Sequence, residues 1–184
     1  MTLYSGSFNP QKITGTAKVL VAAGGNFESI SLTNIHASDA ATVDLYVASS
    51  TGRDITATDV VSAEAEAVST ASVTLTVDDG SGSASDAAND ELLNEKVYKS
   101  DGTFFGTCTT VSSTTALVFS GGLTNAIANN DILHTGTRYY ILKTFSIPVA
   151  STLVLDSKDV SFNNGAYQMY IKLGAGTIDL ISRQ

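Results

Sequence analysis

Carboxylates grouped in one loop are the first residues of this chain that could support chemistry. Asp78 and Asp79, followed by Asp86, Asp90 and Glu91, flank a glycine- and serine-rich stretch that could bind calcium. Calcium needs six to eight oxygen ligands arranged by a tight loop, and the alternating ligands and closing glutamate of an EF-hand are missing here. We therefore expect a solvated loop without a metal.

The two histidines, His36 and His134, lie far apart in the sequence and fall in different predicted modules. A zinc site would need further histidine or carboxylate ligands at matching spacing, and none can be assembled. A hydrolytic triad would need one of the same histidines, and neither a Gly-x-Ser-x-Gly elbow nor a Gly-Lys-Ser/Thr phosphate loop occurs. The sequence predicts no enzyme, no catalytic residue, no metal and no cofactor.

Cys108 is the only cysteine, which excludes an intramolecular disulfide and a thiolate metal cluster. We expect it to be a small buried hydrophobic residue.

Composition restricts the partners and the compartment. The net charge is −8, and the ten lysines and arginines are scattered, which argues against binding to nucleic acid. No apolar run approaches the roughly 20 residues that a bilayer span needs, and residues 1–8 lack the features of a signal peptide. The expectation is a soluble protein made in a cytoplasm, with neither nucleic acid nor membrane as partner.

Alternating apolar and polar residues predict half-buried strands near both ends of the chain, at 28–33, 41–47, 168–173 and 177–182. Because a strand cannot bury its apolar face alone, we expect these outer parts to close on one another as one sandwich. The predicted fold is all-β, an antiparallel, jelly-roll-like β-sandwich. It comprises residues 1–58 and 138–184, and residues 1–12 form an N-terminal arm.

The middle of the chain, residues 59–137, reads as an insertion. Its composition shifts to alanine, glutamate, serine and valine near residues 58–70, and an alternating strand follows at 72–77. An Asp-Gly turn at 101–102 between apolar runs is a strong hairpin signal. About five short strands fit a small β-barrel-like subdomain or a compact sheet.

The seven tyrosines have two possible roles, in sugar binding or in packing and protein contacts. Tyr139 and Tyr140, with the remaining tyrosines at positions 4, 46, 98, 167 and 170, could line a sugar-binding face. Tyrosine that alternates with aliphatic residues in strands is more often packing or a protein interface, and the exposed strand edges favour the interface.

The outer strands follow a definite order: neighbouring strands at 27–36 and 41–47, a long strand ending in Ile147-Pro148, a Leu-x-Leu strand at 153–155, and a C-terminal hairpin. This order resembles that of small β-sandwich virion proteins of tailed bacteriophages, with the middle segment outside the resemblance. The resemblance implies a structural virion protein, either capsid decoration or cement, or a neck, tail or baseplate component.

Such a protein would act in the virion through contacts with copies of itself, as a homo-oligomer, and with other virion proteins. The resemblance supplies no functional residue. The alternative is a carbohydrate-binding module for host attachment, with its site in the insertion near Tyr98 or Phe105; the absence of tryptophan weakens it.

Overall fold

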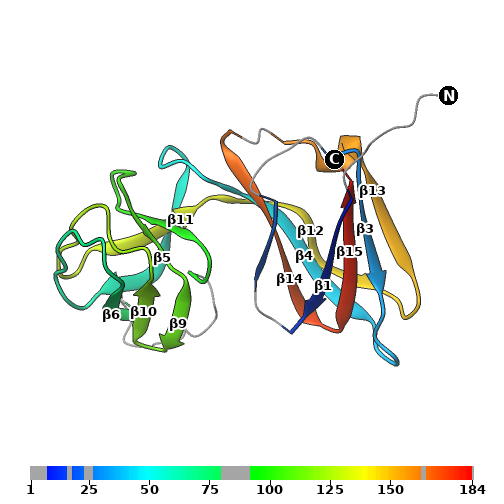
Figure 1. The fold of residues 1–184 in the computed structure, drawn as a ribbon, viewed down its shortest axis with the longest axis horizontal. Helices are drawn as coiled ribbons and strands as arrows, with labels where there is room; N and C mark the ends of the chain where they lie inside the picture. Colours follow the sequence, from blue (N-terminus) through cyan, green and yellow to red (C-terminus); the bar gives the residue numbers. More distant parts are fainter. Residues whose placement is uncertain (1–7, 16–17, 23–26, 80–91, 163–164, 184) are drawn as a thin grey trace. The chain divides into compact units, whose positions relative to one another are not determined.

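The structure is a computed structural model that describes residues 8–15, 18–22, 27–79, 92–162 and 165–183. The regular secondary structure of the described residues is almost entirely β-strand, in two four-stranded sheets and one seven-stranded sheet (Figure 1). The chain divides into two compact units, Met1–Ala48 with Tyr139–Gln184, and Ser49–Arg138. We call the first unit the sandwich and the second the insert.

The sandwich contains eight strands and one short helix among its described residues. Its strands in the first part of the chain are β1 (Phe8–Thr14), β2 (Val19–Ala22), β3 (Ser29–Asn34) and β4 (Ala41–Ser49). Those in the last part are β12 (Arg138–Ile147), β13 (Thr152–Asp156), β14 (Tyr167–Ala175) and β15 (Thr177–Arg183), with α2 (Ser157–Val160) after β13.

The two sheets of the sandwich have the orders β1-β15-β3-β13 and β12-β4-β14-β2. The first four strands therefore pair with the last four in reverse, β1 with β15, β2 with β14, β3 with β13 and β4 with β12. A long hairpin rolled into two sheets in this way has the order of a jelly roll. The predicted all-β, jelly-roll-like sandwich is confirmed.

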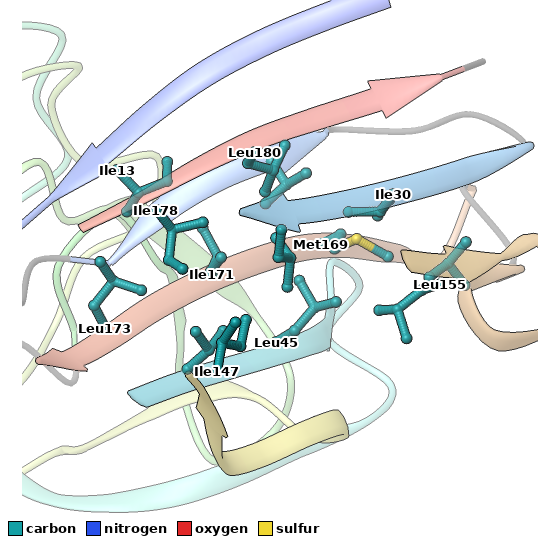
Figure 2. Packing of buried hydrophobic residues seen from close by; sticks show 14 of the residues in the cluster. Ile13, Ile30, Leu45, Ile147, Leu155, Met169, Ile171, Leu173, Ile178 and Leu180 are labelled. Atoms are coloured by element: carbon teal, nitrogen blue, oxygen red, sulfur yellow. The ribbon is translucent and has the colours of Figure 1, made fainter. Parts of the chain in front are cut away.

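The core of the sandwich lies between its two sheets, and Figure 2 shows its aliphatic side chains meeting there. Alternation along the strands explains it, because Ile30 and Leu32 of β3 and Leu180 of β15 point inward and are fully buried. Each such side chain contributes about 1.5–3 kcal/mol relative to exposure. Burial of these alternate residues thus sets which face of each strand points inward.

The insert has its own sheet and core. Its strands are β5 (Ile55–Ser62), β6 (Val73–Asp79), β7 (Lys96–Tyr98), β8 (Phe104–Thr107), β9 (Thr110–Ser113), β10 (Ala116–Phe119) and β11 (Ile132–Gly136). They pair antiparallel in the order β8-β7-β11-β5-β6-β10-β9. The core includes Phe105 and Phe119, whose rings lie 5.1 Å apart.

The insert sheet curls without closing. Its two end strands, β8 and β9, are consecutive in the chain and separated only by Cys108 and Thr109, so the ends of the sheet must approach each other. The described strands nevertheless show no pairing between β8 and β9, and no closed barrel forms.

The boundaries of the insert differ in part from those expected. The insert begins at Ser49 rather than at residue 59, because β5 pairs with β11 and β6 and so belongs to the middle sheet. Its end at Arg138 lies one residue from the expected position. Of the expected N-terminal arm, residues 8–12 belong to β1, which pairs with β15, and residues 1–7 lie outside the described residues.

The two ends of the insert meet at a close backbone approach. The Ser49 amide donates to the Thr137 carbonyl at 3.1 Å, and the Thr137 amide donates to the Asp54 carbonyl at 3.0 Å. Gly136 lies against Ser49 so tightly that a Cβ there would sit 1.8 Å from the Ser49 carbonyl oxygen. Only glycine leaves room for this pairing.

Candidate protein interaction surface

The residues singled out for chemistry do not form a common site. Asp78 is exposed in β6, and Asp79 ends that strand. Residues Asp86, Asp90 and Glu91 lie outside the described residues. Within the described ranges, no group of three or more histidine, cysteine or acidic side chains is placed to hold a metal.

Both histidines have local roles in separate units. In the sandwich, His36 Nδ1 lies 3.0 Å from the Asp39 amide nitrogen and closes a turn. In the insert, His134 Nδ1 lies 3.0 Å from the carbonyl oxygen of Ile132 on its own strand. Cys108 is fully buried in the insert core, as a small hydrophobic residue would be.

A buried polar cluster in the insert was not apparent from the sequence. The Glu95 carboxylate is buried, and its Oε1 lies 3.6 Å from Arg138 Nη2. Tyr98 is buried beside them, and burial followed by the Glu95 charge raises the pKa of Tyr98 to about 12. No signal in the sequence could have found this cluster, because Glu95 and Arg138 lie 43 positions apart and meet only in the folded sheet.

Three tyrosines line up across one sheet of the sandwich. Tyr46 of β4 stacks on Tyr170 of β14 at 5.7 Å between ring centroids, and Tyr140 of β12 lies 5.4 Å from Tyr46. The ammonium groups of Lys143 and Lys18 lie over the outer two rings, at 4.9 Å from Tyr140 and 5.4 Å from Tyr170. Because Tyr46 and Tyr170 are buried, the row packs against neighbouring side chains and does not present an open aromatic platform.

The aromatic residues named for sugar binding are also inaccessible in the insert. Tyr98 and Phe105 are both buried, and Phe105 belongs to the insert core. A sugar ring could not stack on either without opening the sheet. The sequence had no way to separate these buried rings from the exposed Tyr139 and Tyr140.

Large exposed apolar side chains in the sandwich concentrate on its edge strands. Strands β1 and β13 border one sheet, and β12 and β2 border the other. The exposed apolar residues on these edges are Leu20 of β2, Val154 of β13, and Tyr139, Tyr140 and Phe145 of β12. An apolar edge is normally covered in a functioning protein, by another element or by a partner.

Strand β12 is the most conspicuous of these edges. Tyr139, Tyr140 and Phe145 are exposed by 46%, 41% and 41%, within a strand of ten residues. Thr144 interrupts the regular backbone with a φ of +49°, and its amide donates to the Asp44 carboxylate. This break and the charge of Lys143 oppose simple strand addition, so β12 would meet a partner mainly through side chains.

One hollow in the insert has a volume of about 330 Å³, and Phe104 and three threonines are among the residues that border it. It is near the lower limit for a ligand pocket. A second hollow of about 230 Å³ lies between β1 and β15.

No family model matches this chain, and searches of curated proteins and of solved structures found no match. In the part of the chain that the structure describes, no helix has the length and apolar character needed to cross a bilayer.

Proposed function

We propose that this chain is a structural virion protein of a tailed bacteriophage, either a capsid decoration or cement protein or a neck, tail or baseplate component. It acts through contacts with other virion proteins and with copies of itself, and it resides in the virion. The observation that carries the proposal is the concentration of exposed apolar side chains on the edge strands, above all Tyr139, Tyr140 and Phe145 on β12.

Two further features support the proposal. The strand order is that of a jelly roll, an architecture found in viral capsid proteins and also in lectins, and this is an analogy at the level of fold only. The net charge of −8 keeps such a protein dispersed before assembly. Among the described residues, the sandwich offers contact surfaces more clearly than it offers a reaction site.

Incorporation of edge variants into particles tests the proposal. Phage carrying Phe145→Lys or Tyr140→Lys should yield purified particles with at least about tenfold less of this protein, because a buried lysine at a contact leaves an unpaired charge. Quantitative mass spectrometry of the particles measures the loss. Thermal melting of each isolated variant shows whether its fold is kept.

Val68→Lys is the matched control, because Val68 is an exposed apolar residue of the insert that lies on no edge of the sandwich. Its incorporation should equal that of the original protein. Equal incorporation of all three variants would show that β12 does not make the contact. Absence of the original protein from particles would refute the virion role.

A carbohydrate-binding host-attachment module is the second candidate, and the hollow beside Phe104 favours it. Half-buried Phe104 and the hydroxyls of Thr107 and Ser120 border this hollow. The Thr109 and Thr124 hydroxyls already donate to backbone carbonyl oxygens, which leaves few polar groups for a sugar. Glycan-array binding that Phe104→Ala abolishes would support this function, and an array without binding would dismiss it.

A further inference from the structure

The outer face of the β1-β15-β3-β13 sheet shares only Val154 with the edge residues described above. The register places Pro10, Ile181, Ser31 and Val154 side by side, one from each strand, as a row across this face. Ile181 is 42% and Val154 63% exposed. We call the outward side chains of this sheet the β15 face.

Most other side chains on the β15 face are short, and their polar groups are partly satisfied within the sheet. Thr33 and Thr152, which are register partners, share a hydrogen bond of 2.9 Å between their hydroxyls. The Ser31 hydroxyl lies 3.5 Å from the Ile181 carbonyl oxygen. A second sheet can approach such a face to about 10 Å, and little desolvation of unpaired groups opposes it.

Charges on the β15 face lie on both sides of Ile181. Lys12 of β1 is the register partner of Asp179, and Asp156 of β13 lies in the same row as Arg183. Along β15 the outward residues are Asp179, Ile181 and Arg183, so a negative and a positive side chain flank an apolar one. Each charge lies about 7 Å from Ile181 at the usual rise of a strand. Arg183 also pairs with Glu28, at 2.8 Å from Nε to Oε2, and a guanidinium can serve two carboxylates.

We propose that the β15 face is an isologous interface, and that its partner is a second copy of this chain packed face to face through a two-fold axis at Ile181. When the two β15 strands run antiparallel, Arg183 of each copy lies opposite Asp179 of the other, and the Ile181 side chains meet. When they run parallel, like charges would face each other. The charge pattern therefore selects the antiparallel arrangement.

This inference rests on the proposed function only in that both invoke self-association. Edge strand β12 and the β15 face belong to different sheets of the sandwich. A protein that enters particles through β12 but remains a monomer would keep the proposed function and lose this interface.

Charge reversal within one chain tests the interface by sedimentation equilibrium. Asp179→Arg makes both flanking charges positive. The pair Glu28→Lys with Arg183→Glu makes both negative while it keeps the local ion pair with exchanged signs. Each change should weaken the dimer roughly tenfold or more, because two attractions become two repulsions.

All three substitutions combined restore opposite charges on β15 and should return dimer affinity to nearly its original value. This rescue is particular to a partner that is the same chain. Lys99→Glu, a charge reversal in the insert, is the control and should leave the dimer unchanged. Melting temperatures verify that each variant is folded.

Ile181→Ser gives an independent reading if a charge variant fails to fold, since Ile181 is exposed and its loss should weaken only the dimer. A chain that stays monomeric at about 100 μM would overturn the proposal. So would a dimer that neither Ile181→Ser nor Asp179→Arg weakens, or charge variants whose combination does not recover.

Discussion

Asn34 joins three parts of the sandwich through one buried carboxamide. Its Nδ2 donates to the carbonyl oxygens of Asp39 and Ile147, both at 2.9 Å, and its Oδ1 accepts from the His36 amide at 2.9 Å. Asn34→Leu leaves these three backbone groups without their hydrogen-bond partner. We therefore expect a loss of about 2–4 kcal/mol in the free energy of unfolding. Urea unfolding followed by circular dichroism measures it.

Asn125→Leu is the comparison for that measurement. The Asn125 side chain makes an exposed hydrogen bond to the Phe104 carbonyl, and water can replace it. Its loss should cost less than about 1 kcal/mol. Equal costs for the two variants would show that the Asn34 network does not matter.

The raised pKa of Tyr98 leads us to expect a loss of stability at alkaline pH. The pKa of Tyr98 is raised to about 12 in the folded protein, against about 10 in an unfolded chain. The folded state holds the phenol proton more tightly, so its contribution is full below about pH 10 and is lost as the pH rises through about 12. Tyr98→Phe should therefore flatten the fall in melting temperature over this range. An unchanged fall would place the titrating group elsewhere.

Residue types alone predicted some of these environments. Alternation in β3 places Ile30 and Leu32 inside and Ser31 outside, and the structure agrees. The role of Asn34 depends on Ile147, 113 positions away, and that of Tyr98 depends on Glu95 and its burial. Such partners are set by topology, which local patterns do not encode.

The junction between β11 and β4 depends on a glycine. Gly136→Ala would place a Cβ 1.8 Å from the Ser49 carbonyl oxygen, so the backbone must move. We expect a loss of about 2 kcal/mol or more in the stability of the insert, by the strain that overpacking causes. Gly121→Ala, whose Cβ would meet no atom within 4 Å, should change the melting temperature little. Similar effects of both would argue against a tight junction.

At the level of elements, the sequence predicts the closure of the sandwich but not the start of the insert. Apolar alternation at both ends required that the two ends close on each other, and the pairing of β1 with β15 and of β3 with β13 meets that requirement. The change in composition near residue 58 does not mark the start of the insert, which begins at Ser49. Strand β5 crosses residue 58 without interruption.

The whole molecule consists of two units with separate cores. Along the chain the insert lies between β4 and β12, and its two ends meet where the Ser49 amide donates to the Thr137 carbonyl. Replacing residues 49–138 by a short glycine-serine linker should therefore leave a folded sandwich. Circular dichroism and a cooperative melt would verify it, and a chain without a cooperative transition would show that the sandwich needs the insert.

The proposed role is tested most directly by cryo-electron microscopy of phage particles. The particles are purified from a host infected by the phage that encodes this chain. The proposal predicts density for two four-stranded sheets at a symmetric site, with β12 against a neighbouring subunit. Mass spectrometry of the same particles should give a whole-number ratio to the capsid or tail protein. Particles that are complete and contain none of this chain would contradict the proposal.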